Sequence, residues 1–246
     1  MSNEAIATRL AALRARIADA AARSGRSPET IRLVGVSKRQ PLVRIAAAVR
    51  AGLDCIGENY VQEAQAKLPK LRTELERHGI DPPRCRFIGQ LQRNKAGAAV
   101  ELFDAIETLD RERLGASLER RAAAAGRTLE VLLQVDVSGE PGKGGCAPEA
   151  LPSLLAASQQ WPQLRVTGLM AIPAPADDPE QLRPAFSRLR ELRDSLQSAP
   201  GGESLTELSM GMSADFEVAI EEGATSVRIG TALFGPRSIS PHAEKE

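Results

Sequence analysis

Histidine and cysteine are scarce in this chain of 246 residues, and their scarcity argues against several classes of site. The two histidines, His78 and His242, stand apart from any motif, so we expect neither a histidine-based metal site nor a Ser-His-Asp triad. The three cysteines, Cys55, Cys85 and Cys146, suit neither a disulfide framework nor the spacing of a zinc site.

An excess of one charge and a long apolar run are also lacking. The 32 basic and 32 acidic residues balance, which leaves no footprint for nucleic acid or for a membrane surface. No segment approaches the roughly 18 apolar residues of a membrane span, and residues 1–25 carry charges throughout, unlike a signal peptide. We therefore expect a cytoplasmic protein with reduced cysteines and with no nucleic-acid or membrane partner.

What the chain does contain is a regular alternation of strands and helices. Short apolar segments predict eight strands, at 32–37, 53–56, 84–88, 103–107, 129–137, 165–169, 205–209 and 225–229. Helical patterns lie between most of them, at 41–52, 59–78, 93–100, 111–125, 147–159, 179–197 and 214–222. Eight such units predict an α/β protein with a single (β/α)8 barrel of TIM type over residues 1–246, with an extra N-terminal helix and a flexible tail at 238–246.

An open, doubly wound sheet is the structural alternative to a closed barrel. Such a sheet needs a glycine-rich phosphate turn after an early strand, and the chain contains neither GxGxxG nor GxxxxGK[ST]. The segment SGEPGKGGC, residues 138–146, has glycines at other spacings, and Lys143 is followed by glycine. The closed barrel is therefore favoured.

Polar residues gather where the predicted strands end, which is the functional face of such a barrel. Lys38 ends the first strand, Ser213 follows the seventh, and Gly230 and Thr231 follow the eighth. Taken singly, Ser213 is explained as a helix cap and Gly230 as a close-packing residue. Because the loops after strands seven and eight are the common phosphate site of this fold, the two together favour phosphate binding.

Lysine is rare enough to single out Lys38, since only six of the 32 basic residues are lysine. A solvated charge at a strand end explains Lys38 on spacing alone. A lysine can also lose its proton and act as a nucleophile, and the first strand of a closed barrel neighbours the eighth. Lys38 is therefore a candidate to hold a phosphorylated aldehyde cofactor as a Schiff base, with Arg228 donating to the ring nitrogen.

Six motifs between about residues 5 and 237 carry a family resemblance: VGVSK, IGENYVQEA, FIGQLQRNK, GLMAIP, SMGMSADFEVAI and VRIGTALFG. Their order and spacing resemble the pyridoxal phosphate homeostasis protein family. That family is similar to the barrel of bacterial alanine racemases, without their second domain.

The resemblance implies roles for seven residues. Lys38 would form the Schiff base with pyridoxal 5′-phosphate, with Asn59 beside the ring and Met210 packed near it. Ser213, Gly230 and Thr231 would bind the phosphate, and Arg228 would face the pyridine nitrogen. Two positions depart from the family, which often has Asn where Asp136 stands and Pro or His where Gln90 stands; both residues are expected near the cofactor pocket.

Two classes of function remain open. The resemblance favours a non-catalytic protein of intracellular vitamin B6 homeostasis, with apo enzymes that depend on the cofactor as acceptors. The alternative is an amino-acid racemase, which needs a second acid/base group; Tyr60 is the only tyrosine. A barrel that only docks proteins leaves Lys38 unexplained. Without the racemase dimerising domain, we expect a monomer.

Overall fold

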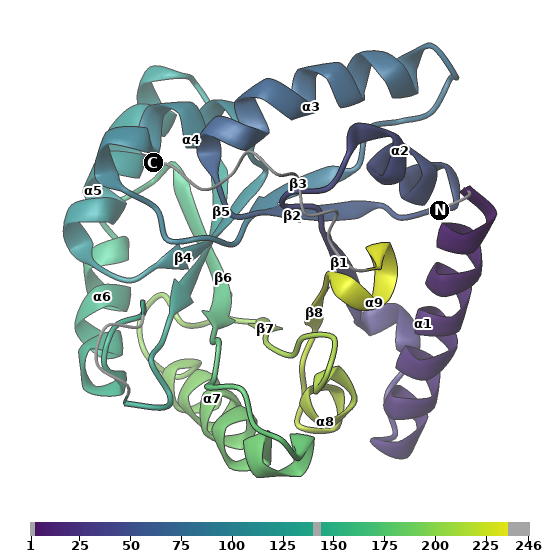
Figure 1. The fold of residues 1–246 in the computed structure, drawn as a ribbon. Coiled ribbons are helices and arrows are strands. Elements are labelled where there is room, and N and C mark those ends of the chain that lie inside the picture. The colour runs from purple at the N-terminus through teal and green to yellow at the C-terminus, as the bar shows by residue number, and fades with distance from the viewer. Residues whose placement is uncertain (1–2, 140–143, 236–246) are drawn as a thin grey trace.

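Eight parallel strands close into a barrel in the computed structural model, which describes residues 3–139 and 144–235 (Figure 1). In chain order the strands are β1 Arg32–Val36, β2 Cys55–Glu58, β3 Arg84–Phe87, β4 Ala105–Leu109, β5 Leu129–Gln134, β6 Leu164–Met170, β7 Glu207–Ser209 and β8 Ser226–Ile229. Each strand pairs with the next, and β8 returns to β1. The predicted (β/α)8 barrel is confirmed, whereas the expected tail at 238–246 lies outside the described residues.

Helices surround the barrel on its outer face (Figure 1). They are α1 Asn3–Arg23, α2 Leu42–Arg50, α3 Val61–Glu76, α4 Ala96–Leu102, α5 Glu112–Ala124, α6 Leu151–Ser158, α7 Arg183–Leu196, α8 Phe216–Glu221 and α9 Thr231–Phe234. Short 3₁₀ turns cover residues 28–30, 93–95, 148–150 and 179–182. The four-residue α9 is the one helix of these that the sequence pattern did not predict. In the part of the chain that the structure describes, no helix has the length and apolar character needed to cross a membrane.

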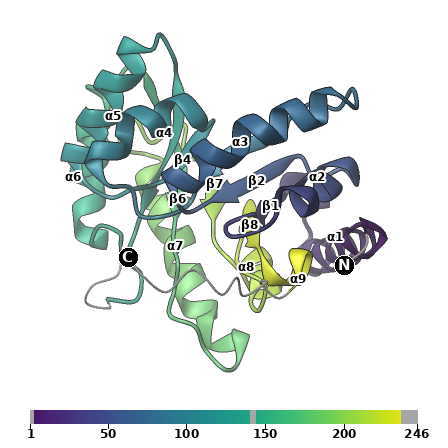
Figure 2. The ribbon, with the colours of Figure 1, turned by 45° about the horizontal axis from the view of Figure 1, so that its top comes forward.

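The extra N-terminal helix, α1, is confirmed. Its apolar residues Ile6, Leu10, Leu13 and Ile17 follow at helical spacing and are all buried. The helix packs against α2, α8 and α9, outside the ring of strands (Figure 2). It therefore covers the barrel where the first and last strands meet.

Two strands begin and end two residues later than the pattern predicts. The strand expected at 53–56 covers Cys55–Glu58, and the one expected at 103–107 covers Ala105–Leu109. Both shifts bring a carboxylate further into the barrel, since Glu58 and Glu107 are fully buried. Acidic residues are depleted in strands, so the pattern left Glu58 beyond the second strand and placed Glu107 at the end of the fourth.

Apolar side chains fill the space between strands and helices, and charged side chains enter the barrel itself. Arg86 and Glu107 are both fully buried and paired at 2.8 Å. The cysteines Cys55, Cys85 and Cys146 are buried free thiols. Within the described residues, no group of His, Cys, Asp and Glu is arranged to hold a metal ion.

Candidate functional site

A cavity of about 290 Å³ opens at the carboxyl ends of β1, β7 and β8. Five of the seven residues singled out in the sequence line it: Lys38, Ser213, Arg228, Gly230 and Thr231. Its remaining walls are Val36, Pro175, Ala176, Pro179, Leu182, Met212, Ala214 and Asp215. The volume is close to the lower end of the range for small-molecule sites, about 300–1,000 Å³. The fold thus brings a lysine, two hydroxyl side chains and a guanidinium together.

The backbone around Lys38 is held from both sides by helix α3. The Lys67 ammonium donates to the Ser37 carbonyl at 2.8 Å, and the Arg39 amide donates to Glu63 Oε1 at 2.6 Å. Lys67 and Glu63 also pair with each other at 2.8 Å. Arg39 adopts a φ of +57°, a conformation that costs energy in residues other than glycine. These contacts fix where the partly buried Lys38 side chain leaves the backbone.

Glu58, at the end of β2, contacts Ser37 and Lys67 from this group. Its carboxylate accepts the Ser37 hydroxyl at 2.5 Å and pairs with Lys67 at 2.6 Å. Burial raises the pKa of Glu58, although the Lys67 charge and both hydrogen bonds oppose this. Its second oxygen, Oε2, is buried and has no hydrogen-bond partner among the described residues. The sequence reasoning missed both Glu58 and Lys67.

Arg228 forms the inner wall of the cavity and is 4% exposed. Its Nη1 donates to Ser209 Oγ at 2.6 Å and its Nη2 to the Ala171 carbonyl at 2.8 Å. Burial lowers the pKa of the guanidinium, and the charges of Glu107 and Asp215 oppose this. The side chain is therefore fixed by neutral acceptors rather than by a direct ion pair among the described residues.

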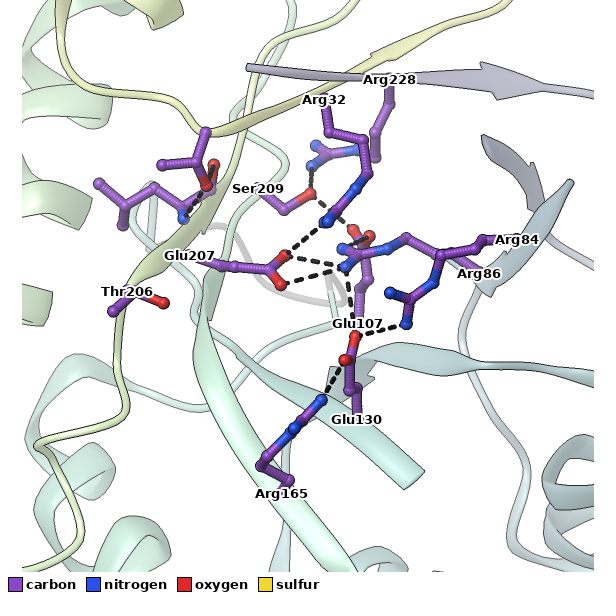
Figure 3. A network of polar contacts seen from close by, with 12 residues as sticks. Arg32, Arg84, Arg86, Glu107, Glu130, Arg165, Thr206, Glu207, Ser209 and Arg228 are labelled. Atoms are coloured by element: carbon purple, nitrogen blue, oxygen red, sulfur yellow. Dashed lines mark hydrogen bonds and ion pairs between the residues drawn. The ribbon is translucent and has the colours of Figure 1, made fainter. Parts of the chain in front are cut away.

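A buried polar network continues from Arg228 through the barrel (Figure 3). Ser209 donates its hydroxyl to Glu107 at 2.6 Å, and Glu107 accepts from Arg86 at 2.8 Å. Arg86 pairs in turn with Glu207 at 2.9 Å. Burial alone would lower the pKa of Arg86, but the carboxylates of Glu107 and Glu207 reverse this and raise it.

The loop after β7 is braced by Asp215. Its carboxylate accepts the Met212 amide at 2.6 Å, and the Asp215 amide donates to the Met212 carbonyl at 3.1 Å. Among the described residues, the amides of Ser213 and Ala214 at the loop tip have no acceptor. The Ser213 hydroxyl accepts the Ala232 amide at 3.5 Å, which connects this loop to the one after β8. The tip thus offers donors to an anion.

Gly230 leaves open space at the cavity wall. A Cβ added there would lie 3.5 Å from Val36 Cβ, an ordinary contact, and φ is −106°. Neither backbone conformation nor packing against the described residues requires glycine at this position. The absence of a side chain fits a phosphate group that approaches the backbone closely.

The structure does not bring Asn59 and Met210 into the same cavity. Asn59 lines a neighbouring cavity of about 400 Å³ together with Gln90, and its buried Oδ1 has no partner among the described residues. Met210 is fully buried in the core, and Met212 lines the Lys38 cavity. Asp136 caps a turn by accepting the amides of residues 138 and 139 at 3.0 and 2.9 Å, and it lines neither cavity.

A larger cavity, about 920 Å³, lies at the opposite end of the barrel. It is bordered by Arg32 and Glu207, which pair with each other at 3.2 Å. We place the candidate site at the smaller cavity because it lies at the carboxyl ends of the strands, where the sites of such barrels are found, and because Lys38, Ser213 and Thr231 line it.

Comparisons with known proteins match nearly the whole chain. A family model described as "Alanine racemase, N-terminal domain" matches residues 8–238. The pyridoxal phosphate homeostasis protein of Pseudomonas aeruginosa is 46% identical over 238 residues, which cover 97% of this chain and 98% of that protein. The protein of the same name in Aquifex aeolicus is 44% identical over 230 residues, which cover 93% and 97%.

Solved structures agree with these matches. PipY of Synechococcus elongatus PCC7942, solved with pyridoxal phosphate bound, is 38% identical with a TM-score of 0.80, over 94% of this chain and 100% of that one. The crystal structure of a protein from Bifidobacterium adolescentis, described as unknown, is 37% identical with a TM-score of 0.88, over 94% of this chain and 95% of that one.

Proposed function

The chain belongs to the pyridoxal phosphate homeostasis protein family, and from that premise we propose that it binds pyridoxal 5′-phosphate on Lys38 and serves vitamin B6 homeostasis without catalysing a reaction. One observation carries the proposal. Lys38, Ser213, Thr231 and Arg228 line one cavity, so a single ligand bound there would meet an amine, two hydroxyls and a guanidinium. A phosphorylated pyridine aldehyde has a group for each of them.

Lys38 would hold the aldehyde. Its amine would hold the aldehyde carbon through a reversible carbon–nitrogen double bond, formed with loss of water. The contacts of Lys67 and Glu63, both on α3, support this role because they fix the backbone on both sides of the lysine. Reversibility suits a protein that stores the cofactor and releases it.

The loops after β7 and β8 would hold the phosphate. The hydroxyls of Ser213 and Thr231, together with the amides at the tip of the first loop, can donate to it. Gly230 leaves the space for the phosphate to approach.

Arg228 would face the pyridine nitrogen and keep it unprotonated. A guanidinium only donates hydrogen bonds, so the nitrogen must supply its lone pair. The bound cofactor, which can stabilise a carbanion when its ring is protonated, would then be a weaker electron sink. We propose Asn59 and Met210 as further neighbours of the ring, since both follow the carboxyl ends of barrel strands.

The racemase alternative needs a second acid/base group opposite Lys38. Tyr60 is 45% exposed and lines the neighbouring cavity, and the Arg39 guanidinium lies 5.8 Å from its ring centroid. A tyrosine turned toward solvent supports the carrier over the racemase.

The free, buried cysteines suit a reducing compartment, so we propose that the protein is cytoplasmic. We also propose that it is a monomer, because a single barrel lacks the dimerising domain of the racemases.

The test is covalent mapping. The purified protein incubated with pyridoxal 5′-phosphate and reduced with borohydride should carry the adduct on Lys38, and Lys38→Ala should carry none. Modification mainly on Lys95 or Lys143 would overturn the assignment. Holo-protein mixed with an apo enzyme that depends on the cofactor should restore that enzyme's activity. Exchange of the α-proton of L-alanine in deuterated water at about 1 s⁻¹ or faster would instead make the protein an enzyme.

A further inference from the structure

We infer that Ser209 and Glu107 are positioning residues for Arg228, and that they hold its guanidinium against the cavity wall. The inference rests on the proposed function, in which Arg228 faces the cofactor ring. The observation behind it is a buried positive charge with no directly bound carboxylate among the described residues. Arg228 is buried, yet the described residues give it no ion pair, and its two end nitrogens are bound to a hydroxyl and a carbonyl. A buried guanidinium without a nearby counter-charge is costly.

Ser209 is the link that makes the arrangement directional. A hydroxyl has one proton, and Ser209 gives it to Glu107 Oε2 at 2.6 Å. The lone pairs on its oxygen are then left to accept from Arg228, which lies 2.6 Å away. The Glu107 carboxylate therefore determines which way the Ser209 hydroxyl points, and the hydroxyl determines where Arg228 is held.

On its other side, Glu107 is paired with Arg86. Arg86 contacts its Oε1 at 2.8 Å, and both side chains are fully buried. Figure 3 shows the resulting order, with Ser209 between Arg228 and Glu107 and with Arg86 beyond them. The Glu107 carboxylate is thus one hydroxyl away from the Arg228 guanidinium, where it offsets the cost of burying that charge.

Stability alone does not explain this network. Replacing a buried ionic group with apolar residues of similar volume is often neutral or stabilising. The contacts join β3, β4, β7 and β8 and end on a residue of the cavity wall, so their position favours a role in the site.

A double-mutant cycle tests the inference. Ser209→Ala should weaken pyridoxal 5′-phosphate binding by about tenfold in the wild-type background and by less than about twofold when Arg228 is already Gln. Glu107→Gln should show the same dependence on Arg228. Equal losses in both backgrounds would overturn the inference, because a purely structural role adds independently.

Ser226→Ala is the matched control. Ser226 is the register partner of Ser209 on β8, and its buried hydroxyl has no partner among the described residues. This variant should bind the cofactor within about twofold of wild type. A tenfold loss here, equal to that of Ser209→Ala, would also overturn the inference, because any lost buried hydroxyl would then suffice.

Two spectroscopic readouts separate this inference from the proposed function. In the cofactor-free protein, the guanidinium protons of Arg228 should exchange slowly with solvent by NMR, and Ser209→Ala should speed their exchange. With ¹⁵N-labelled cofactor, the pyridine nitrogen signal should shift in Ser209→Ala and stay in place in Ser226→Ala. Wild-type protein that fails to bind the cofactor would overturn the proposed function, and the exchange measurement would still decide the inference. Unchanged exchange in Ser209→Ala would overturn the inference alone, even where Glu107→Gln fails to fold.

Discussion

The Lys67 ammonium lies 2.8 Å from the carbonyl oxygen of Ser37, one residue before the lysine proposed to bind the cofactor. The same ammonium lies 2.6 Å from the Glu58 carboxylate, which is fully buried. One side chain on α3 thus holds the end of β1 and neutralises the end of β2. Strands β1 and β2 are adjacent, so Lys67 links their carboxyl ends beside the cavity that Lys38 lines.

Lys67→Met should destabilise the protein strongly. The substitution leaves Glu58 as a buried carboxylate without its counter-charge, which typically costs about 3–5 kcal/mol. Urea denaturation should show a clear fall in the unfolding midpoint. Lys70→Met, at an exposed position of the same helix, is the control and should unfold like wild type. Matching midpoints for the two variants would contradict the role of Lys67.

Ser213→Ala and Thr231→Ala should each weaken binding of the phosphorylated cofactor. A hydrogen bond to a charged group is worth roughly 1.5–3 kcal/mol, or about one to two decades in affinity. Fluorescence titration with pyridoxal 5′-phosphate measures the loss. Pyridoxal, which lacks the phosphate, is the control ligand and should bind both variants like wild type. Equal losses for both ligands would mean that these hydroxyls support the loops instead.

Gly230→Ala should separate folding from binding. The added Cβ meets Val36 at an ordinary distance of 3.5 Å, so the melting temperature should stay close to that of wild type. The methyl group occupies space proposed for the phosphate, so cofactor affinity should fall. Gly211→Ala is the contrasting variant, because φ is +90° there and the new Cβ would lie 2.6 Å from Ala219 Cβ; it should lower the melting temperature. Full affinity in Gly230→Ala would exclude the phosphate from this wall.

Asp215→Asn should change how stability depends on pH. Burial raises the pKa of Asp215, so the folded chain binds its proton more tightly than the unfolded chain does. The contribution of Asp215 to the free energy of unfolding is therefore lost as the pH rises from about 4 toward the raised pKa. Asn can still accept the Met212 amide but does not titrate. Urea midpoints from pH 4 to pH 7 should show the variant gaining relative to wild type as the pH rises, whereas the exposed Asp177→Asn should follow wild type throughout.

The order of strands and helices could be predicted from the sequence because each element buries one face, and that repeats along the chain. The ends of β2 and β4 could not, because Glu58 and Glu107 are charged residues inside a barrel. Their burial depends on partners that a local pattern does not reveal. Ser209 lies 102 residues from Glu107 along the chain.

The candidate site was predictable to the same extent. Lys38, Ser213 and Gly230 all follow strands, and the closed barrel brings strand ends together. The groups that hold them, Lys67 and Asp215, sit on a helix and in a loop, where charged residues are ordinary. The signal available for the interior network was a charged residue within a strand segment, such as Glu107 in Ala105–Leu109 or Arg86 in Arg84–Phe87.

Because the three cysteine thiols are buried, their rates of chemical labelling report how often the folded protein opens. Cys55 and Cys85 lie on the adjacent strands β2 and β3, and burial raises the pKa of each to about 12. Cys146 lies outside the barrel strands, where its backbone forms an isolated β-bridge with Val135 just after β5. Burial raises the pKa of its thiol to about 11. Because only an exposed thiolate reacts with an alkylating reagent, each cysteine is labelled only while its surroundings are open. The labelling rate of Cys146 then measures how often its loop opens locally. The labelling rates of Cys55 and Cys85 measure how often the barrel itself opens.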